Sequence, residues 1–548
     1  LGVIAGLGLA LLIGHSVFGT SSFGAGTLAA SLWAGGAALA GLLIAAAAIA
    51  LPAWRNARQL TVAGQRRAVG RNRPRPLWSR LGLDFVALGA SALVYWQAST
   101  NGYKLVLAPE GLPQVSVNWY ALLAPVLAWV GVGLLAYRLA DLVLVRGRGP
   151  LGRLLRPLSG ELAPTVASTM ARQRHLLARA VTLVALTVAF AGSTAVFNAT
   201  YQQQAEVDAR LSNGADVTVT ESPGVSVGPS GATALAAVPG VSSVEPLQHR
   251  FAYIGPDLQD LYGVRTGTIG AAGRLQNGWF QGGSASQLMA TLGSTPDSLL
   301  VSAETVKDFQ LLPGDLVRLR LQNGLTKAYT TVPFHYAGVA TEFPTAPHDS
   351  FFVANADYVA KATGSDAVGT FLLQTDGTSP TTVARRVQNL LGTTATVTDI
   401  ASQRTIIGSN LTAVELSGLT RVELAFALLL AAAASGLTLG LGFQERSRTF
   451  AIARALGARP RQLGGFIWGE SAFVTGGGLL LGGGIATGLS IMLVKVLTGV
   501  FDPPPDVLSV PWLYLGGVGA LTLGAVGAAG ALTLRSLRRP AIEELRDL

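Results

Sequence analysis

Few side chains in this sequence have the spacing that a reaction would need. Gly224–Gly228 (GVSVG) matches the GxSxG pattern, in which Ser226 would act as a nucleophile. That pattern requires a strand before the serine and a helix directly after it. Here Pro223 stands before the pattern and a Pro-Ser-Gly sequence follows it, which is a composition typical of loops. We therefore interpret this segment as a loop and predict no catalytic residue in it.

A metal site and a nucleotide site are equally poorly supported. His335, His348 and Asp349, together with Glu342, could hold a metal ion, but their spacing fits no known ligand pattern. The neighbouring Tyr336–Val339 has the composition of a strand. The chain contains no cysteine, which excludes thiolate ligands, and no GxxxxGK[ST] loop to hold the phosphates of ATP. We predict no metal and no cofactor bound by this chain.

The composition is that of a membrane protein. Half of the residues are apolar and 13% are charged, and the mean hydropathy is +0.44, whereas about a quarter of the residues of a soluble domain are charged. A helix needs about 20 mostly apolar residues to cross a membrane. We predict spans at 1–17, 27–52, 81–98, 119–145, 178–198, 421–443, 467–497 and 511–535. Because the first begins at once and Leu1 is not an initiator Met, we expect further residues before it.

Arginine divides the connections between these spans into two sets. The arginine-rich set comprises 53–80, 146–179, 444–463 and the tail from Arg535, and the other connections, 18–26, 99–118 and 498–510, contain one lysine in total. The positive-inside rule places the first set in the cytoplasm, and the segment 199–420 then lies outside. Asp84, Arg138 and Asp141 fall near cytoplasmic span ends, where we expect them to extend toward the headgroups.

The long outer segment differs in charge from the rest of the chain. Residues 200–418 contain 12 Lys and Arg against 18 Asp and Glu, a net charge of −6, so the remaining residues carry +16. The positive charge is spread over membrane-flanking connections, which argues against nucleic-acid binding. Alternation at 215–220 and 317–321 predicts strands, as do 336–339 and 351–353, whereas 232–237 and 382–391 predict helices. We expect a mixed α/β domain of two lobes built from non-contiguous strands.

The two ends of the membrane part resemble each other. An offset of 480 residues aligns 1–58 with 481–538 without a gap, and each part contains a span, a short outer connection, a second span and an arginine-rich exit. Duplicated halves are typical of transport proteins. The alternative is chance similarity between two hairpins rich in Gly and Ala.

The connection 444–463, which we name the coupling segment, has more internal order than a topology signal requires. Ile452 and Leu456 lie one turn apart on one side of a short predicted helix. Arg454 projects from the opposite side, where it can contact an acidic or carbonyl-rich partner. Gly457 and the proline three residues later end this helix. We interpret the segment as a stiff docking element; the alternative is a solvated basic loop.

The same residues resemble a known family. The sequences at 445–448 (ERSR), 451–458 (AIARALGA) and 461–463 (RQL) look like the signature of the FtsX-like (MacB-type) ABC transporter permeases. The resemblance extends over the Gly-rich 476–488, the proline-containing 502–505 and the exit 538–541, and more weakly over 299–301, 313–315 and 336–339 in the outer segment. The family's usual acidic residue near Thr449 or Phe450 is missing here.

The resemblance implies how the segment works. In that family the signature helix contacts an ATPase subunit, so a dimer of ATPase subunits would bind ATP and Mg²⁺ and dock here. The residues implied for this contact are Glu445, Arg446, Arg448, Ile452, Arg454, Leu456 and Gly457. Within the following span, Gly478 and Gly482, and likewise Gly484 and Gly488, have the GxxxG spacing that permits close helix packing. That packing could be a moving interface or a static one.

The resemblance to ten-span members, in which two permease halves are fused, gives a domain plan. We expect the end of a first half at 1–58, a cytoplasmic linker at 59–80, a linker pair of spans at 81–145 and a cytoplasmic segment with an amphipathic interfacial helix at 146–177. The second half then comprises a span at 178–198, the outer domain at 199–420 and three spans at 421–548. A first span and a first copy of the signature would precede Leu1.

The sequence therefore predicts a polytopic α-helical protein of the plasma membrane with a large extracytoplasmic mixed α/β domain. We expect a non-catalytic permease subunit that couples ATP hydrolysis by a partner ATPase to shape changes of the outer domain by mechanotransmission. Its ligand would be a lipid, a lipoprotein or an amphipathic peptide. The alternatives are a mechanical regulator of a cell-wall hydrolase, a sensor of antimicrobial peptides, or a membrane-embedded enzyme that uses Ser226 or His348.

Overall fold

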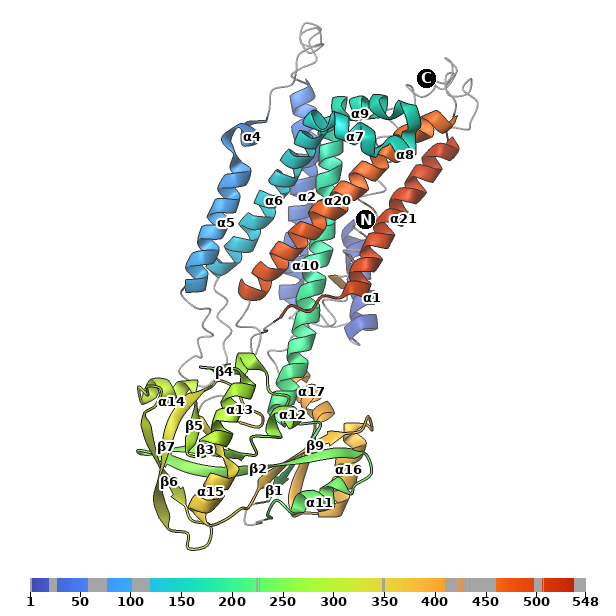
Figure 1. Ribbon diagram of the computed structural model, residues 1–548. Helices are drawn as coiled ribbons and strands as arrows, with labels where there is room; N and C mark the ends of the chain where they lie inside the picture. The colour runs from blue at the N-terminus through green and yellow to red at the C-terminus, as the bar shows by residue number, and fades with distance from the viewer. Residues whose placement is uncertain are drawn as a thin grey trace. The chain divides into compact units, whose positions relative to one another are not determined.

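The chain forms two compact units in the computed structural model. The described residues are 2–18, 27–57, 76–100, 119–222, 225, 227–346, 350–409, 422, 423, 425, 426, 429, 433, 460–496, 505 and 507–536. The helical unit comprises Leu1–Ala199, Glu415–Thr498 and Ser509–Leu548, and the α/β unit comprises Thr200–Val414 and Gly499–Leu508. Helix α10 contributes residues to both units (Figure 1).

The described helices of the helical unit coincide with seven of the eight predicted spans. They are α1 (Gly2–Phe18), α2 (Thr27–Ala57), α5 (Leu83–Thr100), α6 (Trp119–Arg146), α10 (Arg174–Asn213), α20 (Pro460–Val496) and α21 (Trp512–Ser536), with the short α4 (Leu77–Leu81) before α5. Among the described residues, four stretches are long and apolar enough to cross a membrane: Leu123–Arg146, Arg174–Asn213, Gly464–Val496 and Trp512–Ala531. The predicted span 421–443 lies almost entirely outside the described residues.

Helix α10 is the most buried of these apolar helices. Helix α6 lies along one side of it, where Gly133 faces Leu186 and the rings of Trp129 and Phe190 meet edge to face at 6.4 Å. Helix α20 lies along another side through Gly478, against which α10 packs. Helix α10 is therefore packed between α6, which belongs to the predicted linker pair, and α20, which is one of the last predicted spans.

The buried charges of the helical unit pair with one another. Asp84 is fully buried, and Arg138 Nη2 donates to Asp84 Oδ1 at 2.7 Å and to the carbonyl of Ser79 at 2.9 Å. Asp141 lies 3.3 Å from Arg174. The expectation that Asp84 extends toward the headgroups was therefore wrong, because its buried carboxylate is paired with the arginine beside it.

The connection between α6 and α10 folds as a run of short helices, which we name the strap. It consists of α7 (Arg148–Leu154), α8 (Arg156–Ser159), the 3-10 turn η1 (Gly160–Leu162) and α9 (Ala163–Arg172). The amphipathic helix predicted from Ser159 to Arg174 is thus present as α9, but it begins at Ala163, after Gly160 with its positive φ of 57° and the turn η1. Its apolar side packs in the same core as α10 and α20 and does not face lipid.

The α/β unit contains one ten-stranded mixed sheet. Its strands are β1 (Val217–Glu221), β2 (Val241–Ile254), β3 (Asp257–Val264), β4 (Phe280–Gln281), β5 (Ser298–Ser302), β6 (Leu316–Gln322), β7 (Tyr329–Ala340), β8 (Phe351–Asn355), β9 (Gly369–Thr375) and β10 (Ala395–Asp399). Its helices are α11 (Gly231–Ala236), α12 (Ile269–Ala272), η2 (Asn277–Trp279), α13 (Ala285–Ser294), α14 (Ala303–Asp308), α15 (Ala356–Thr363), α16 (Pro380–Leu391) and α17 (Ile400–Ser409). All the strands and helices predicted for this segment are confirmed.

The described part of the unit has three hydrophobic cores, and two of them lie toward opposite ends of the sheet and define its two lobes. The strand order is β10-β1-β9-β2-β3-β8-β5-β7-β4, and β6 pairs with both β2 and β7. The pairings β2-β3-β8-β5-β7-β6 therefore close into a barrel, whose interior includes alternate residues of β6. In the other lobe, α11 and α16 pack on β1, β9 and β10 (Figure 1). The non-contiguous strands expected from the sequence are confirmed, and so is the membrane-helix plus α/β fold class.

Candidate functional site at the junction of α10 and α17

Helices α10 and α17 lead from the α/β unit toward the predicted spans, and the strands that adjoin them are neighbours in the sheet. Helix α10 leads into β1, and β10 leads into α17. These strands pair antiparallel with Val217 opposite Asp399, so the end of α10 and the start of α17 lie at the same edge of the sheet. Beyond α17 the chain continues toward the predicted span 421–443. The fold thus brings both connections of this unit to one place.

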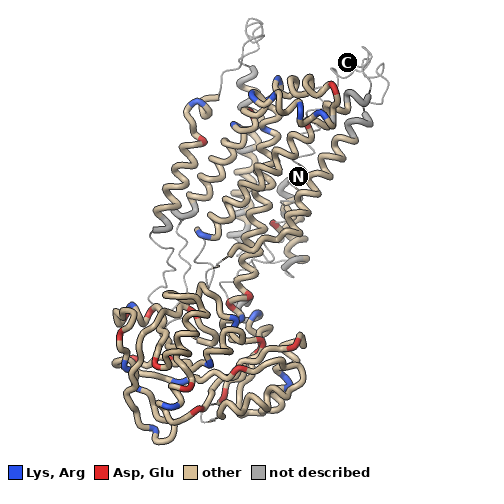
Figure 2. The backbone as a smooth tube through the Cα atoms, in the orientation of Figure 1, with Lys and Arg blue, Asp and Glu red and all other residues tan. Residues whose placement is uncertain are grey.

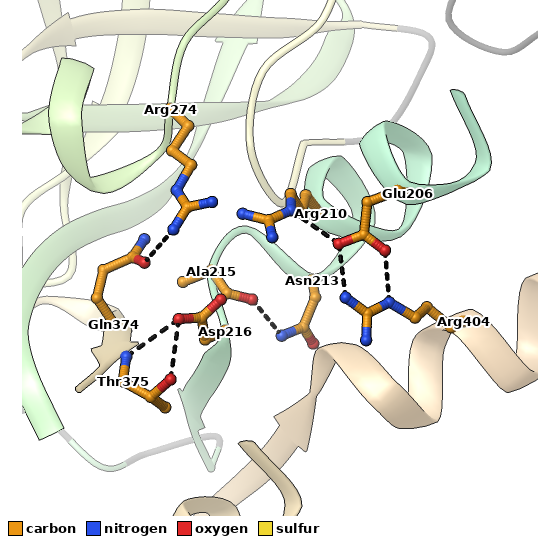
Figure 3. A network of polar contacts seen from close by, with 9 residues as sticks. All are labelled: Glu206, Arg210, Asn213, Ala215, Asp216, Arg274, Gln374, Thr375 and Arg404. Atoms are coloured by element: carbon orange, nitrogen blue, oxygen red, sulfur yellow. Dashed lines mark hydrogen bonds and ion pairs between the residues drawn. The ribbon is translucent and has the colours of Figure 1, made fainter. Parts of the chain in front are cut away.

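An ion-pair cluster joins the two helices, and we name its members Glu206, Arg210 and Arg404 the clamp. Arg404 Nε donates to Glu206 Oε2 at 2.5 Å, and Arg404 Nη2 donates to Oε1 at 2.6 Å. Arg210 Nε, one turn along α10, donates to the same Oε1 at 3.0 Å (Figure 3). This fork-to-fork geometry fixes direction as well as distance, because both oxygens of the carboxylate are engaged.

The clamp also shifts the ionisation of its members. The side-chain hydrogen bonds from Arg404 hold the pKa of Glu206 below its usual value of 4.5, although partial burial opposes this effect. The same bonds raise the pKa of Arg404. Glu206 lies beyond the predicted span 178–198.

Polar contacts at the sheet edge hold both helix ends. Asp399 Oδ1 accepts hydrogen bonds from the backbone amides of Ala401 and Ser402, at 3.0 and 3.1 Å, at the start of α17. At the end of α10, Asn213 Oδ1 accepts from Thr398 Oγ1 of β10 at 2.8 Å. Asp216 Oδ2 accepts from the amide of Thr375 at 3.1 Å, which ties the start of β1 to β9 (Figure 3). These hydrogen bonds therefore attach the helix ends that carry the clamp to the sheet.

We expect Arg404→Gln to weaken the junction in a pH-dependent way. At pH 7 the protection of α17 amides against hydrogen exchange should fall about fivefold, because a partly exposed ion pair contributes about 1 kcal/mol. A carboxylate with a lowered pKa contributes stability above its unfolded-state pKa and loses it as the pH falls through the folded-state pKa. At pH 3 the wild type and the variant should therefore differ less than at pH 7. Arg385→Gln, an exposed arginine of α16, is the control. Equal protection of α17 in the wild type and Arg404→Gln at pH 7 would contradict the clamp.

Only some of the site residues predicted from the sequence lie among the described residues. The ATPase-contact residues 445–457 lie outside the described residues, as do Ser226, His348 and Asp349. His335 Nδ1 lies 2.8 Å from Asp297 Oδ2 at an exposed position. In the described part of the chain, no group of three or more His, Asp and Glu side chains is placed to hold a metal ion.

The predicted packing glycines face different surroundings. A Cβ added to Gly478 would lie 2.5 Å from Val184 Cγ1, and one added to Gly482 would lie 2.8 Å from the carbonyl oxygen of Ala185, so both glycines allow α20 to approach α10. Among the residues that the structure describes, a Cβ at Gly484 or Gly488 would meet no atom within 4 Å. The two GxxxG pairs, which are alike in sequence, therefore differ in environment.

Sequence reasoning did not find the clamp. Glu206 and Arg404 are separated by 198 positions along the chain, and neither lies in a motif. The only local signal is the spacing of Glu206 and Arg210, which is that of an ion pair one turn apart on a helix. The partner on α17 follows from strand pairing, which the sequence does not reveal.

Known proteins resemble parts of this chain in sequence and in structure. Residues 421–541 match the family model described as FtsX-like permease C-terminal. The periplasmic region of MacB from Actinobacillus actinomycetemcomitans is similar with a TM-score of 0.25 and 14% identity, over 36% of this chain and 96% of that chain. The extracellular domain of the noncanonic ABC-type transporter YknZ from Gram-positive bacteria is similar with a TM-score of 0.23 and 15% identity, over 33% and 99%. A comparison with curated proteins gave no match.

Proposed function

We propose that this chain is the transmembrane permease subunit of an ABC transporter of the FtsX-like type. The observation that carries the proposal is the match of 421–541 to the FtsX-like permease C-terminal family, because this range includes the whole coupling segment together with α20 and α21. The arrangement of long apolar helices and one α/β unit fits that role. The fused, ten-span plan is part of the same proposal.

In this proposal, a partner protein supplies the energy by hydrolysing ATP. The chain contains no phosphate-binding GxxxxGK[ST] loop, so ATP and Mg²⁺ belong to a separate ATPase dimer on the cytoplasmic side. That dimer docks on the coupling segment, with Arg454 and its neighbours as the contact. The permease itself performs no catalysis.

Helix α10 is the element best suited to carry the resulting movement. Helix α20 starts at Pro460, inside the coupling segment, and its Gly478 and Gly482 lie directly against α10. The last turns of α10 belong to the α/β unit, where Glu206 binds Arg404 of α17. A displacement of the coupling segment would therefore pass from α20 to α10 and then to the clamp. The path consists of a glycine-lined contact, along which α20 can slide against α10, and of the charge-assisted bonds of the clamp, which hold α10 to α17.

The work is done on a ligand outside the membrane. The acidic composition of 200–418 and the predicted topology place the α/β unit there. The described spans carry few polar side chains that could line a path for a polar solute, so we propose a lipid, a lipoprotein or an amphipathic peptide as the ligand. Co-purification from the native membrane, followed by lipid and protein mass spectrometry, identifies it. Recovery of a cell-wall hydrolase without lipid or peptide would favour a purely mechanical regulator.

We expect Arg454→Glu to weaken retention of the ATPase by about 30-fold or more, since disrupting a charged pair at an interface costs at least about 2 kcal/mol. The measurement is co-purification of the ATPase with the full chain, followed by ligand-stimulated ATP turnover. The control is Arg66→Glu, the same reversal in the cytoplasmic linker 59–80. Normal ATPase retention and turnover in Arg454→Glu would show that the coupling segment does not dock the motor.

A further inference from the structure

The strap has two chemically different sides. Its inner side is apolar and buried, with Leu151, Leu155, Val166 and Met170 in the core of the helical unit. Arginine positions recur along its backbone from α7 to α9 (Figure 2), and their side chains are exposed. The exposed cations are Arg148, Arg153, Arg156 and Arg172, and the only acid in the strap is Glu161.

The inner side fixes the strap to the first turns of α20. Ser159 Oγ donates to the carbonyl of Gly465 at 2.9 Å, and a Cβ on Gly469 would lie 3.1 Å from Val166 Cγ1. A side chain at Gly465 or Gly469 would crowd the strap, because the strap approaches the α20 backbone closely at both positions. The arginines therefore project from a held scaffold and not from a loose loop, which reduces the entropy lost when a ligand orders them.

The ends of the strap set its depth in the membrane. It begins directly after α6 and ends directly before α10, and both helices contain stretches apolar enough to cross a membrane. A segment joining the same-side ends of two spanning helices lies at the level of the lipid headgroups. Leu154, whose side chain is 75% exposed between Arg153 and the arginines that follow, can insert into the acyl boundary.

We propose that the outer side of the strap is a binding site for the headgroups of anionic phospholipids. Charge complementarity favours this occupant, because four guanidinium groups against one carboxylate attract phosphate, and arginine binds phosphate oxygens with two parallel hydrogen bonds. The exposed Leu154 beside them can contact the acyl chain of the lipid whose headgroup the arginines bind. A zwitterionic lipid offers the same phosphate with its own cation, so the site selects for net negative charge.

The test uses the full chain, purified in detergent, stripped of lipid and offered equal amounts of phosphatidylglycerol and phosphatidylcholine. Native mass spectrometry should show that wild type retains phosphatidylglycerol preferentially. Arg153→Gln/Arg156→Gln should weaken that retention about 30-fold, since each arginine near an anionic surface contributes a factor of about five. Retention of phosphatidylcholine should not change. Arg318→Gln/Arg385→Gln removes the same charge from exposed positions of the α/β unit and is the matched control.

Several outcomes would overturn the proposal. They are equal retention of the two lipids by wild type, an undiminished preference in Arg153→Gln/Arg156→Gln, or an equal loss in the control variant. If the strap variant keeps its lipid preference but loses a co-purified acidic protein, the occupant is that protein and the lipid site is wrong. Should the first variant not fold, Arg148→Gln/Arg172→Gln tests the same surface. The measurement needs no ATPase, so its result is independent of the proposed permease function.

Discussion

Replacing Gly478 with leucine should separate α20 from α10 and destabilise the helical unit by about 2 kcal/mol or more. A Cβ at this position would lie 2.5 Å from Cγ1 and 2.8 Å from Cβ of Val184, whose side chain is 1% exposed. Overpacking of this kind costs about 1–3 kcal/mol, whereas the gain from replacing glycine in a helix is at most about 1 kcal/mol. The steric cost therefore exceeds the gain in helix propensity, and the midpoint temperature of thermal unfolding of the detergent-purified chain should fall.

The same substitution two turns along α20 provides the control. At Gly484 a Cβ would meet no atom of the described part of the chain within 4 Å, so Gly484→Leu should leave the thermal midpoint unchanged or raise it slightly through helix propensity. The comparison separates packing from the general effect of an added leucine. An equal loss in the two variants would show that Gly478 has no special contact with α10.

A disulfide between α10 and α20 should stop ATP-driven turnover. A Cβ on Gly192 of α10 would lie 2.8 Å from the Cβ of Ala486 on α20, and a disulfide needs about 3.8 Å, so a small adjustment admits the bond in Gly192→Cys/Ala486→Cys. The wild-type chain has no cysteine, which leaves these two thiols without competitors. If α20 passes movement to α10 by sliding against it, oxidation should reduce turnover of the reconstituted complex at least tenfold, and a reductant should restore it.

The single variants Gly192→Cys and Ala486→Cys control for the substitutions themselves. Each should retain turnover under oxidising conditions, because neither can form the intramolecular bond. Full turnover of the oxidised double variant, with the disulfide verified by mass spectrometry, would show that the interface is static. Movement would then pass from α20 to α10 with the two helices fixed together, and the glycines would serve packing alone.

Much of the local structure follows from the sequence because its causes are local. Apolar stretches of spanning length predicted seven helices that the structure contains, and alternation at 317–321 predicted β6. An interior strand must alternate when one face lines a barrel, so the pattern is visible without knowing the partners. The net charge of 200–418 likewise separated the α/β segment from the membrane part.

The sequence by itself determined that this chain has membrane helices, where its α/β unit lies along the chain, and that 444–463 differs from an ordinary connection. It could not distinguish Gly478 from Gly484, because identical spacing says nothing about which face of a helix meets a neighbour. It did not pair Glu206 with Arg404 or Asp84 with Arg138, since those contacts join segments that only the fold brings together. It also assigned the apolar side of α9 to lipid, whereas α20 and α10 cover it. An amphipathic pattern records that a face is buried, and only tertiary packing decides what buries it.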